Sequence, residues 1–414
     1  MRKILFIFAL SFIVIMSPSQ NNIALGQWQE YLSYKKAISV TATNGRVYCA
    51  AKGGVFWFSM LDNSLHHLSK LNGLSDIEAV KVKFNSSNKK VLIAYKNTNL
   101  DIIEENGTIV NIPDIKNKPL FGNKVINTIF MDGKFAYLAC GFGIVVLDME
   151  KEEIKESYSI DPLGNAINIR DITLDALNIY ATTDEGIYKA SRTANLSIYT
   201  SWSKMTGLPA GIYNAITSVN GKLYANLSHF LMSGVSNKDE IYVYENGAWT
   251  LFSKMPSFGF TGKAMKNYEN KLLITTTSIV HLYDDVASTM QIVNNINGVG
   301  YLETYESDMS GTTVWIADQN YGLIRNDNFY GRSDYFYPSG PVSTNVNAMC
   351  VAGDDLWVVP GGLTPANSNS LTTDGISVRS NNEWTILSKK QGIIDFDTIY
   401  DIVNVIADPI NPRK

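Results

Sequence analysis

The sequence predicts an all-β protein, and three observations on its 414 residues lead to that fold class. Short apolar runs alternate with turn signals, almost no segment shows the period of an amphipathic helix, and one pattern of strands recurs about every 45 residues. The composition, 45% apolar and 11% aromatic, provides for a large core and excludes a disordered chain.

Each repeat is predicted to contain four short strands. An apolar strand, a turn of the Asn-Gly kind, a second strand ending in a small residue, a glycine, a third strand, a short turn and a fourth strand follow in order. Four strands per unit at a period of about 40–50 residues are typical of a β-propeller. The rows of this pattern begin near Ala37, Ile77, Val125, Ile167, Tyr213, Phe260, Leu302, Asn345 and Asp397.

Turn residues recur at equivalent places in different rows. Asn44-Gly45, Asp132-Gly133 and Asn220-Gly221 lie between the predicted first and second strands, and Asn106-Gly107 and Asn246-Gly247 precede predicted fourth strands. Such pairs favour the left-handed conformations of a type I′ turn, whose twist matches that of paired strands. We therefore expect hairpins at these five places.

A glycine also precedes the predicted third strand in four rows, as Gly54, Gly143, Gly186 and Gly322. A residue without a Cβ tolerates a tight turn and a close approach of other chain segments. We expect these glycines near the central axis, where a side chain would collide with neighbouring rows.

Eight rows are complete, and a ninth is predicted to start with a strand at Asp397. We expect residues 27–344 to close a first, seven-bladed propeller, and residues 345–414 to form the opening blades of a second, incomplete propeller. A single eight-bladed ring is the alternative. The connections Ser228–Asp239 and Pro360–Asp374 are longer than the rest and are expected to decorate one face.

The N-terminus is predicted to be a signal peptide over residues 1–26. Arg2-Lys3 precede the thirteen apolar or small residues Ile4–Met16, and Ala24-Leu25-Gly26 supplies a small-residue cleavage site. No later stretch reaches the ~18 apolar residues of a membrane helix. We therefore expect an exported protein without a transmembrane span in the mature chain, in the periplasm or at the outer-membrane surface.

Charge and motifs exclude several classes of function. A net charge of −4 without a basic cluster argues against nucleic acid as a partner. The three cysteines form no disulfide framework or zinc motif, and no catalytic motif occurs, so we expect no enzyme, no metal and no cofactor. Ser307–Thr312 departs from the spacing of a sialidase box and is interpreted as a turn.

One stretch, Phe329–Pro338, is dense in aromatic residues and offers candidates for ligand binding. Sugar rings stack on aromatic faces, and an arginine beside them can pair with a phosphate or carboxylate. Packing between blades explains the same residues, and both interpretations stay open. The candidate ligand-binding residues are Tyr330, Arg332, Tyr335 and Tyr337.

The first row carries a specific likeness. It opens on Gln27-Trp28-x-x-Tyr31-Leu32-x-Tyr34 and closes on Leu68-Ser69-Lys70-Leu71-Asn72-Gly73-Leu74-Ser75-Asp76. With the signal peptide, this resembles the N-terminal propeller region of the PorZ family, surface components of the type IX secretion system of Bacteroidota. The resemblance implies a non-enzymatic protein that assists the PorU sortase and presents anionic lipopolysaccharide. The family also carries a second propeller and a C-terminal β-sandwich, and this sequence ends at Lys414 without the sandwich.

Two other functions remain open. The periplasmic propellers of hybrid two-component regulators resemble these repeats and detect oligosaccharides, but such a regulator requires a membrane span and a kinase downstream of the propellers. A propeller lyase or glycosidase is disfavoured because no catalytic constellation appears in the sequence.

Overall fold

The computed structural model describes residues 28–119, 122–161, 165–255, 257–296, 300–329, 331–362, 364, 366, 368–388, 392–393, 396, 398–408 and 410. The predicted signal peptide and Tyr330 lie outside these residues. The chain divides into two units, Met1–Tyr31 and Leu32–Lys414, and all strands belong to the second. No helix in the described residues has the length and apolar character that crossing a bilayer would require.

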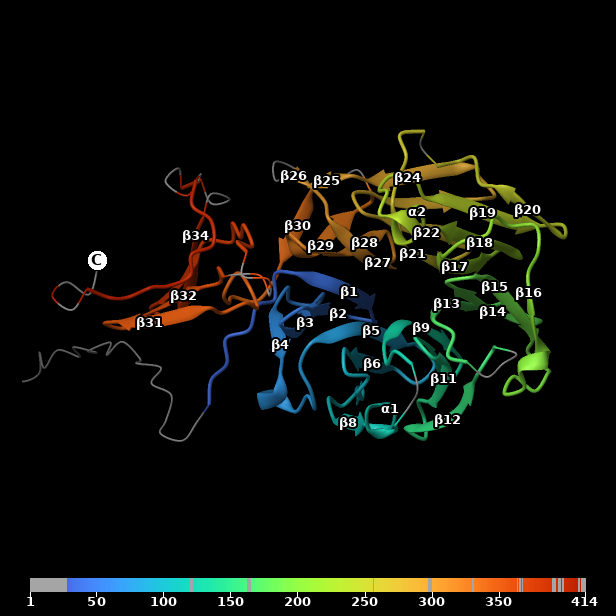
Figure 1. The fold of residues 1–414 in the computed structure, drawn as a ribbon, viewed down its shortest axis with the longest axis horizontal. Coiled ribbons are helices and arrows are strands. Elements are labelled where there is room, and N and C mark those ends of the chain that lie inside the picture. Colours follow the sequence, from blue (N-terminus) through green and yellow to red (C-terminus); the bar gives the residue numbers. More distant parts are fainter. Residues whose placement is uncertain are drawn as a thin grey trace, which may run out of the picture. The chain divides into compact units, whose positions relative to one another are not determined.

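The predicted all-β fold class is confirmed, because eight four-stranded antiparallel sheets follow one another along the chain (Figure 1). Within each sheet, consecutive strands pair as hairpins, so each sheet is one blade made from one row of the sequence. The first four blades are β1 (Ala37–Ala42), β2 (Arg46–Ala51), β3 (Gly54–Ser59) and β4 (Leu65–Leu68); β5 (Ala79–Asn85), β6 (Lys90–Tyr95), β7 (Leu100–Ile103) and β8 (Ile109–Ile112); β9 (Ile126–Asp132), β10 (Phe135–Cys140), β11 (Gly143–Asp148) and β12 (Glu153–Tyr158); and β13 (Ile169–Leu174), β14 (Asn178–Thr183), β15 (Gly186–Ser191) and β16 (Trp202–Lys204).

The later blades have the same order of strands. They are β17 (Tyr213–Val219), β18 (Lys222–Leu227), β19 (Glu240–Glu245) and β20 (Ala248–Leu251); β21 (Gly262–Tyr268), β22 (Lys271–Thr276), β23 (Val280–Asp284) and β24 (Thr289–Val293); β27 (Thr304–Ser310), β28 (Thr313–Asp318), β29 (Gly322–Asp327) and β30 (Ser333–Phe336); and β31 (Ala348–Ala352), β32 (Asp355–Val359), β33 (Ile376–Ser380) and β34 (Glu383–Leu387). A small hairpin, β25 (Asn295–Ile296) with β26 (Gly300–Tyr301), precedes the seventh blade.

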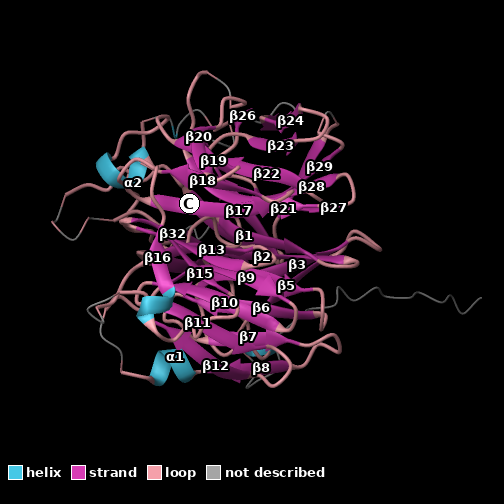
Figure 2. Cartoon of the chain, turned by 90° about the vertical axis from the view of Figure 1, so that its right-hand side faces the viewer, coloured by secondary structure: helices cyan, strands magenta, loops and turns pink. Residues whose placement is uncertain are grey.

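Helical structure is confined to short connections. The α-helices are α1 (Asp114–Asn117), after the second blade, and α2 (His229–Ser233), inside the long connection between β18 and β19. Two single-turn 3₁₀ segments occur at Lys70–Asn72 and Tyr199–Ser201. Figure 2 shows α1 and α2 on the same side of the strands, so connections from different blades gather on one face of the ring.

Seven blades close into one ring. The first strands β1, β5, β9, β13, β17, β21 and β27 each pack against the next, and β27 packs against β1 (Figure 1). The alternative of a single eight-bladed ring is therefore wrong. The eighth sheet, β31–β34, pairs with no strand of the other seven.

Side chains, rather than an exchanged strand, close the ring. The first and seventh blades are each built from one continuous stretch of chain, and one apolar cluster joins them. In it, the ring of Phe58 lies 5.4 Å from Trp315 and 4.5 Å from Phe336, centroid to centroid. Phe58 and Trp315 are fully buried, so the seam has the character of a protein core.

Hairpins form at all five predicted places, but the type I′ angles occur at only two of them, since at Gly45, Gly107 and Gly133 the glycine alone has a positive φ. Asn220 and Gly221 have φ of 51° and 77°, and Asn246 and Gly247 have φ of 53° and 84°. Positive φ at both central residues is the type I′ requirement that Asn-Gly satisfies.

The recurrent glycines were predicted to avoid a collision with neighbouring rows, and this explanation is wrong. Gly54, Gly143, Gly186 and Gly322 do open the third strands. However, a Cβ at Gly143 would lie 2.5 Å from the carbonyl oxygen of Tyr158, and one at Gly322 would lie 2.8 Å from that of Phe336. Tyr158 and Phe336 end the fourth strands β12 and β30. At Gly143 and Gly322 the close approach is thus within a blade, because the fourth strand ends against the hairpin between the second and third strands, whereas a Cβ at Gly54 would first meet Tyr34, which precedes β1.

Two further sequence interpretations require correction. The ninth-row strand does not form, since residues 398–408 contain no strand in the structure. No neighbouring strand pairs with this segment, and it instead bonds to the eighth blade, with Gly361 N donating to Ile402 O and Asp401 N to Thr372 O. The segment Ser307–Thr312 is a turn only at its end, because residues 307–310 complete β27.

Candidate functional site

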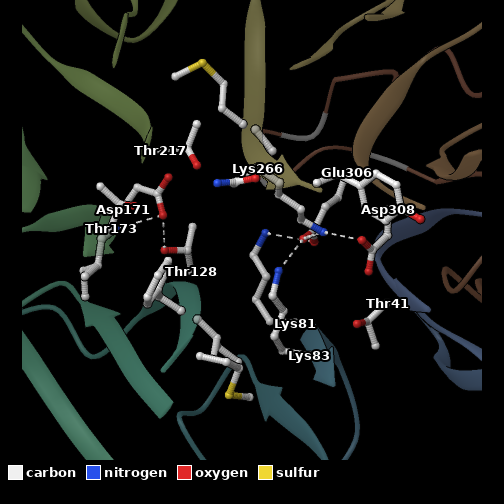
Figure 3. A pocket seen from close by; sticks show the side chains of 18 of the residues that line it. Thr41, Lys81, Lys83, Thr128, Asp171, Thr173, Thr217, Lys266, Glu306 and Asp308 are labelled. Carbon is white, nitrogen blue, oxygen red and sulfur yellow. Dashed lines mark hydrogen bonds and ion pairs between the residues drawn. The ribbon is translucent and has the colours of Figure 1, made fainter. Parts of the chain in front are cut away.

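A cavity of about 550 Å³ occupies the place where the seven first strands converge (Figure 3). Every blade of the ring contributes to its walls, so the cavity exists only when the ring is closed. We call it the central cavity. Its charged and hydroxyl-bearing lining includes Thr41, Lys81, Lys83, Thr128, Asp171, Thr173, Thr217, Lys263, Lys266, Glu306 and Asp308.

A β-bulge positions these side chains. The register of the first strand against the second shifts at the same place in all seven blades, between Ala37 and Ser39 in β1 and between Ala79 and Lys81 in β5, for example. A bulge inserts one extra residue, so it changes the face of the sheet on which each later side chain lies. Beyond the bulge, residues two positions apart again lie on the same face. The seven blades therefore present equivalent side chains in two layers.

The two layers are defined by the first residue after the bulge and by the residue two positions later. Most members are polar, and all but Ser39 and Ala215 line the cavity. The first layer is Ser39, Lys81, Thr128, Asp171, Ala215, Ala264 and Glu306, and the second is Thr41, Lys83, Phe130, Thr173, Thr217, Lys266 and Asp308.

Part of each layer links neighbouring blades. A side-chain oxygen on one first strand accepts a hydrogen bond from a backbone N–H of the next first strand. Thr41 Oγ1 accepts from Phe84 N at 3.1 Å, and Asp171 Oδ2 accepts from Ile216 N at 2.9 Å. The same kind of contact closes the ring, where Asp308 Oδ2 accepts from Ala42 N at 3.0 Å. These contacts satisfy N–H groups that the sheet hydrogen bonds leave unpaired.

The charged members of the layers converge on Glu306. Its carboxylate lies 2.9 Å from Lys266 Nζ, 3.8 Å from Lys81 Nζ and 4.0 Å from Lys83 Nζ. Ser39 donates its hydroxyl to Glu306 at 2.6 Å, and Lys266 Nζ is also 3.9 Å from Asp308. Figure 3 shows the three lysines pointing from two walls toward this one carboxylate.

Burial and mutual charge shift the pKa values of this cluster. Burial would raise the pKa of Glu306, but the ammonium groups of Lys266, Lys81 and Lys83 outweigh it and hold that pKa far below its usual range. The carboxylates of Asp308 and Glu306 raise the pKa of Lys266 despite its burial. Lys83 behaves differently, since burial and the charge of Lys266 lower its pKa to about 8.

Asp171 stands on another wall of the cavity. It accepts hydrogen bonds from the hydroxyl of Thr128 at 2.8 Å and from the N–H groups of Ile172 and Ile216, each at 2.9 Å. Burial nevertheless raises its pKa to about 6. The cavity thus combines ionised groups with a carboxyl group that takes up a proton under mildly acidic conditions.

Of the candidate ligand-binding residues from the sequence, Arg332, Tyr335 and Tyr337 do not line the central cavity. Arg332 is exposed, with a side-chain accessibility of 82%, and its Nε lies 3.4 Å from Asp334. Tyr335, on the fourth strand β30, stacks with Tyr337 at 6.3 Å between ring centroids. Tyr330 is not among the described residues. The structure places Tyr335 and Tyr337 side by side on the seventh blade and leaves their ligand-binding role a prediction.

The lysines and acids of the central cavity were not among the residues predicted from the sequence. Lys81 and Lys83 alternate with apolar residues in β5, as Glu306 and Asp308 alternate with other residues in β27. Such alternation normally indicates a solvent-facing side of a strand. The available signal was the position of these pairs in the first strand of their rows, which is the strand nearest the axis of a propeller.

The described residues contain neither a disulfide nor a group of side chains that could hold a metal ion. Cys49, Cys140 and Cys350 are all free thiols, and the first two are buried. Burial raises the pKa of Cys140, which makes its thiol unreactive. Across the same part of the chain, no three His, Cys, Asp or Glu side chains are grouped as metal ligands would be.

Comparison with known proteins finds a matching family model and a shared fold. Residues 47–203 match the family model of the N-terminal β-propeller domain of PorZ from the type IX secretion system. Among solved structures, PorZ of Porphyromonas gingivalis, described as an essential bacterial surface component of that system, superposes with a TM-score of 0.71 at 20% identity. That match covers 88% of this chain and 46% of PorZ, so the chain spans about half the length of that relative.

A second solved structure shares the fold more distantly. The extracellular domain of a putative hybrid two-component system from B. thetaiotaomicron superposes with a TM-score of 0.55 at 15% identity, over 87% of this chain and 49% of the other. No curated protein sequence matches the chain. The resemblance predicted from the first row is confirmed: residues 47–203 match the family model of the PorZ N-terminal β-propeller domain, and the fold is shared with the PorZ structure.

Proposed function

We propose that this protein is an exported, non-enzymatic scaffold of the type IX secretion system. The match of residues 47–203 to the PorZ N-terminal propeller domain carries the proposal, and the structural similarity to PorZ over 88% of the chain supports it. In this role it assists a PorU-like sortase at the outer-membrane surface, and it presents anionic lipopolysaccharide as the acceptor for secreted cargo.

A rigid ring suits presentation rather than catalysis. Each blade is held to the next by apolar clusters and by side-chain-to-backbone hydrogen bonds, so the connections at the ends of the strands keep fixed positions. Several connections, with α1 and α2 among them, form one composite face (Figure 2). We propose that this face contacts the sortase-like partner.

In this proposal, residues 1–26 are a signal peptide, residues 27–344 form the first propeller and residues 345–414 form the opening blades of a second. The eighth blade supports the last assignment. On β31, Met349 and Val351 are 66% and 69% exposed, whereas Val40 on β1, Ile129 on β9 and Ile216 on β17 are buried. Apolar residues on a first strand need a neighbouring blade to cover them.

Deletion of the gene in the native organism, with complementation by the wild-type gene, tests the proposal. We expect secreted cargo to lose its attachment to the cell surface in the deletion strain and to regain it on complementation, as measured by surface proteolysis and immunoblotting. Normal attachment of cargo in the deletion strain would refute the scaffold function.

The alternative is an oligosaccharide-sensing propeller of a hybrid two-component regulator, and the fold shared with such an extracellular domain favours it. The same deletion strain discriminates the two. A sensor predicts intact cargo attachment and loss of polysaccharide-induced transcription, whereas a secretion scaffold predicts the opposite.

A further inference from the structure

The central cavity is lined by several charged side chains of both signs. Its walls carry four lysines, namely Lys81, Lys83, Lys263 and Lys266, against the three acids Asp171, Glu306 and Asp308. A charge withdrawn from water is costly unless a counter-charge accompanies it. Lys263 also faces Glu303 and Asp239, so the three lysines Lys81, Lys83 and Lys266 share the three acids of the lining.

Unsatisfied hydrogen-bond donors accompany these lysines. An ammonium group carries three N–H donors. Lys81 and Lys83 approach Glu306 only at 3.8 and 4.0 Å, beyond hydrogen-bond length. Lys266 Nζ is buried, and no acceptor in the described part of the chain meets it with the angles of a hydrogen bond, although Glu306 lies 2.9 Å away. Three neighbouring ammonium groups therefore have donors to offer toward one point.

We propose that the central cavity binds a phosphate group, held by Lys81, Lys83 and Lys266. A phosphate has several acceptor oxygens in a tetrahedral arrangement, so it can accept from ammonium groups that arrive from different walls, and lysine binds phosphate as a point charge. Glu306 and Asp308 hold the lysines in place, while the ammonium N–H groups that they leave unsatisfied are free to donate to the anion. This site is independent of the secretion function proposed above.

The remaining lining leaves space for what the phosphate is attached to. A cavity of about 550 Å³ is much larger than one phosphate ion, and it lies within the range of small-molecule sites. Thr173 and Thr217 line the same cavity as the lysines. A sugar phosphate and free inorganic phosphate share the chemistry that the lysines recognise.

Binding is expected to depend on pH through Lys83. Its ammonium form loses its proton near pH 8, because burial and Lys266 disfavour the charge. A bound phosphate stabilises the charged form, so affinity falls as the pH rises above about 8. The titratable groups that face Lys83 are Lys81 on its own strand, Lys266 on β21, Glu306 and Asp308 on β27, and Asp171 on β13.

Isothermal titration calorimetry of the purified full chain tests the site, with inorganic phosphate and glucose 1-phosphate as probes. We expect saturable binding that Lys83→Met weakens about tenfold or more, since a charge-assisted contact is lost. Lys89→Met is the matched control, because Lys89 lies near the other end of the same hairpin, exposed and paired with Glu105. It should bind as the wild type does.

Lys83→Met is suited to this test because it removes a charge that burial disfavours, and its fold can be verified by circular dichroism. Tighter binding of glucose 1-phosphate identifies a sugar phosphate as the ligand, and equal or tighter binding of inorganic phosphate identifies the free ion. The proposal is overturned if neither probe binds more tightly than about 10 mM. Equal affinities of the Lys83→Met and Lys89→Met variants would also overturn it.

Discussion

Ser39 donates a hydrogen bond of 2.6 Å to Glu306 across a sequence separation of 267 residues. The bond joins the first blade to the seventh at the seam where the ring closes. Glu306 also holds three lysines from the second and sixth blades, so one carboxylate connects four blades at the axis. The charged centre of the ring and its closure are thus one structural unit.

Replacement of Glu306 by Gln is expected to destabilise the ring strongly. The variant leaves Lys81, Lys83 and Lys266 facing each other without their shared carboxylate, and breaking such a buried pair costs about 3–5 kcal/mol. Urea denaturation measures the free energy of unfolding. The control Glu105→Gln breaks an exposed pair with Lys89 and should cost at most about 1 kcal/mol. Lys83→Met added to Glu306→Gln should restore part of the lost stability, and equal stability of Glu306→Gln and the wild type would contradict this account.

The links between neighbouring blades can be tested at Thr41. Thr41→Val keeps the shape of the side chain but leaves the N–H of Phe84 without its acceptor, so we expect a loss of about 1–3 kcal/mol in the free energy of unfolding. Thr41→Ser keeps the hydroxyl and should lose less. Hydrogen exchange at the Phe84 amide should accelerate in the valine variant alone, and similar protection in both variants would show that the hydroxyl does not make this link.

His281 is expected to make stability depend on pH. It is 1% exposed on β23, its Nδ1 has no hydrogen-bond partner in the described residues, and burial lowers its pKa to about 4. The folded state therefore keeps His281 neutral, while the unfolded chain takes up a proton below about pH 6.5. Its contribution is complete above pH 6.5 and is lost as the pH falls to about 4, and it amounts to roughly 3 kcal/mol.

Denaturation midpoints between pH 4 and 8 measure this contribution. His281→Phe cannot take up a proton, so its stability should fall less steeply than that of the wild type between pH 6.5 and 4. Above pH 7 the difference between the two proteins should become constant. Parallel curves over the whole range would exclude His281 as the cause.

The close approach at Gly143 predicts that alanine is poorly tolerated there. Gly143 has φ of 138°, and a Cβ would meet the Tyr158 carbonyl oxygen. Gly107 also has a positive φ, of 89°, but a Cβ there would have nothing within 4 Å. We expect Gly107→Ala to cost about 1–2 kcal/mol for backbone strain alone, and Gly143→Ala to cost clearly more. Thermal melting of the two variants compares them, and equal losses would show that the clash is relieved at no cost.

The fold was predictable because its signals are local. Asn220-Gly221 and the equivalent turns specify hairpins through their own backbone preferences, and rows of equal length specify equal blades. The count of rows in the sequence left two choices for the ring, seven blades or eight. The packing of β27 against β1 decides it, and this contact depends on curvature accumulated over seven blades.

The candidate site was hidden for a different reason. The run from Ala79 to Asn85 alternates lysine with apolar residues, as an exposed strand does, and closure of the ring turns that face inward. The bulge that brings Lys81 and Glu306 into equivalent positions leaves no residue signature that the rows share, since the extra residue is Val80 in one blade and Tyr305 in another. Lys81 and Lys83 therefore meet Glu306 and Asp308 only because the bulge occurs at the same place in both first strands.

Closure by side chains has a consequence for how the chain folds as it emerges from N- to C-terminus. The face of the first blade that carries Phe58 waits for Trp315, which is synthesised after five further blades. Until then, the open arc of stacked sheets exposes this apolar face of the first blade to solvent. The nascent chain is therefore most dependent on chaperones during a long interval that ends when the seventh blade arrives, and mutations in that last blade should trap an open, aggregation-prone arc.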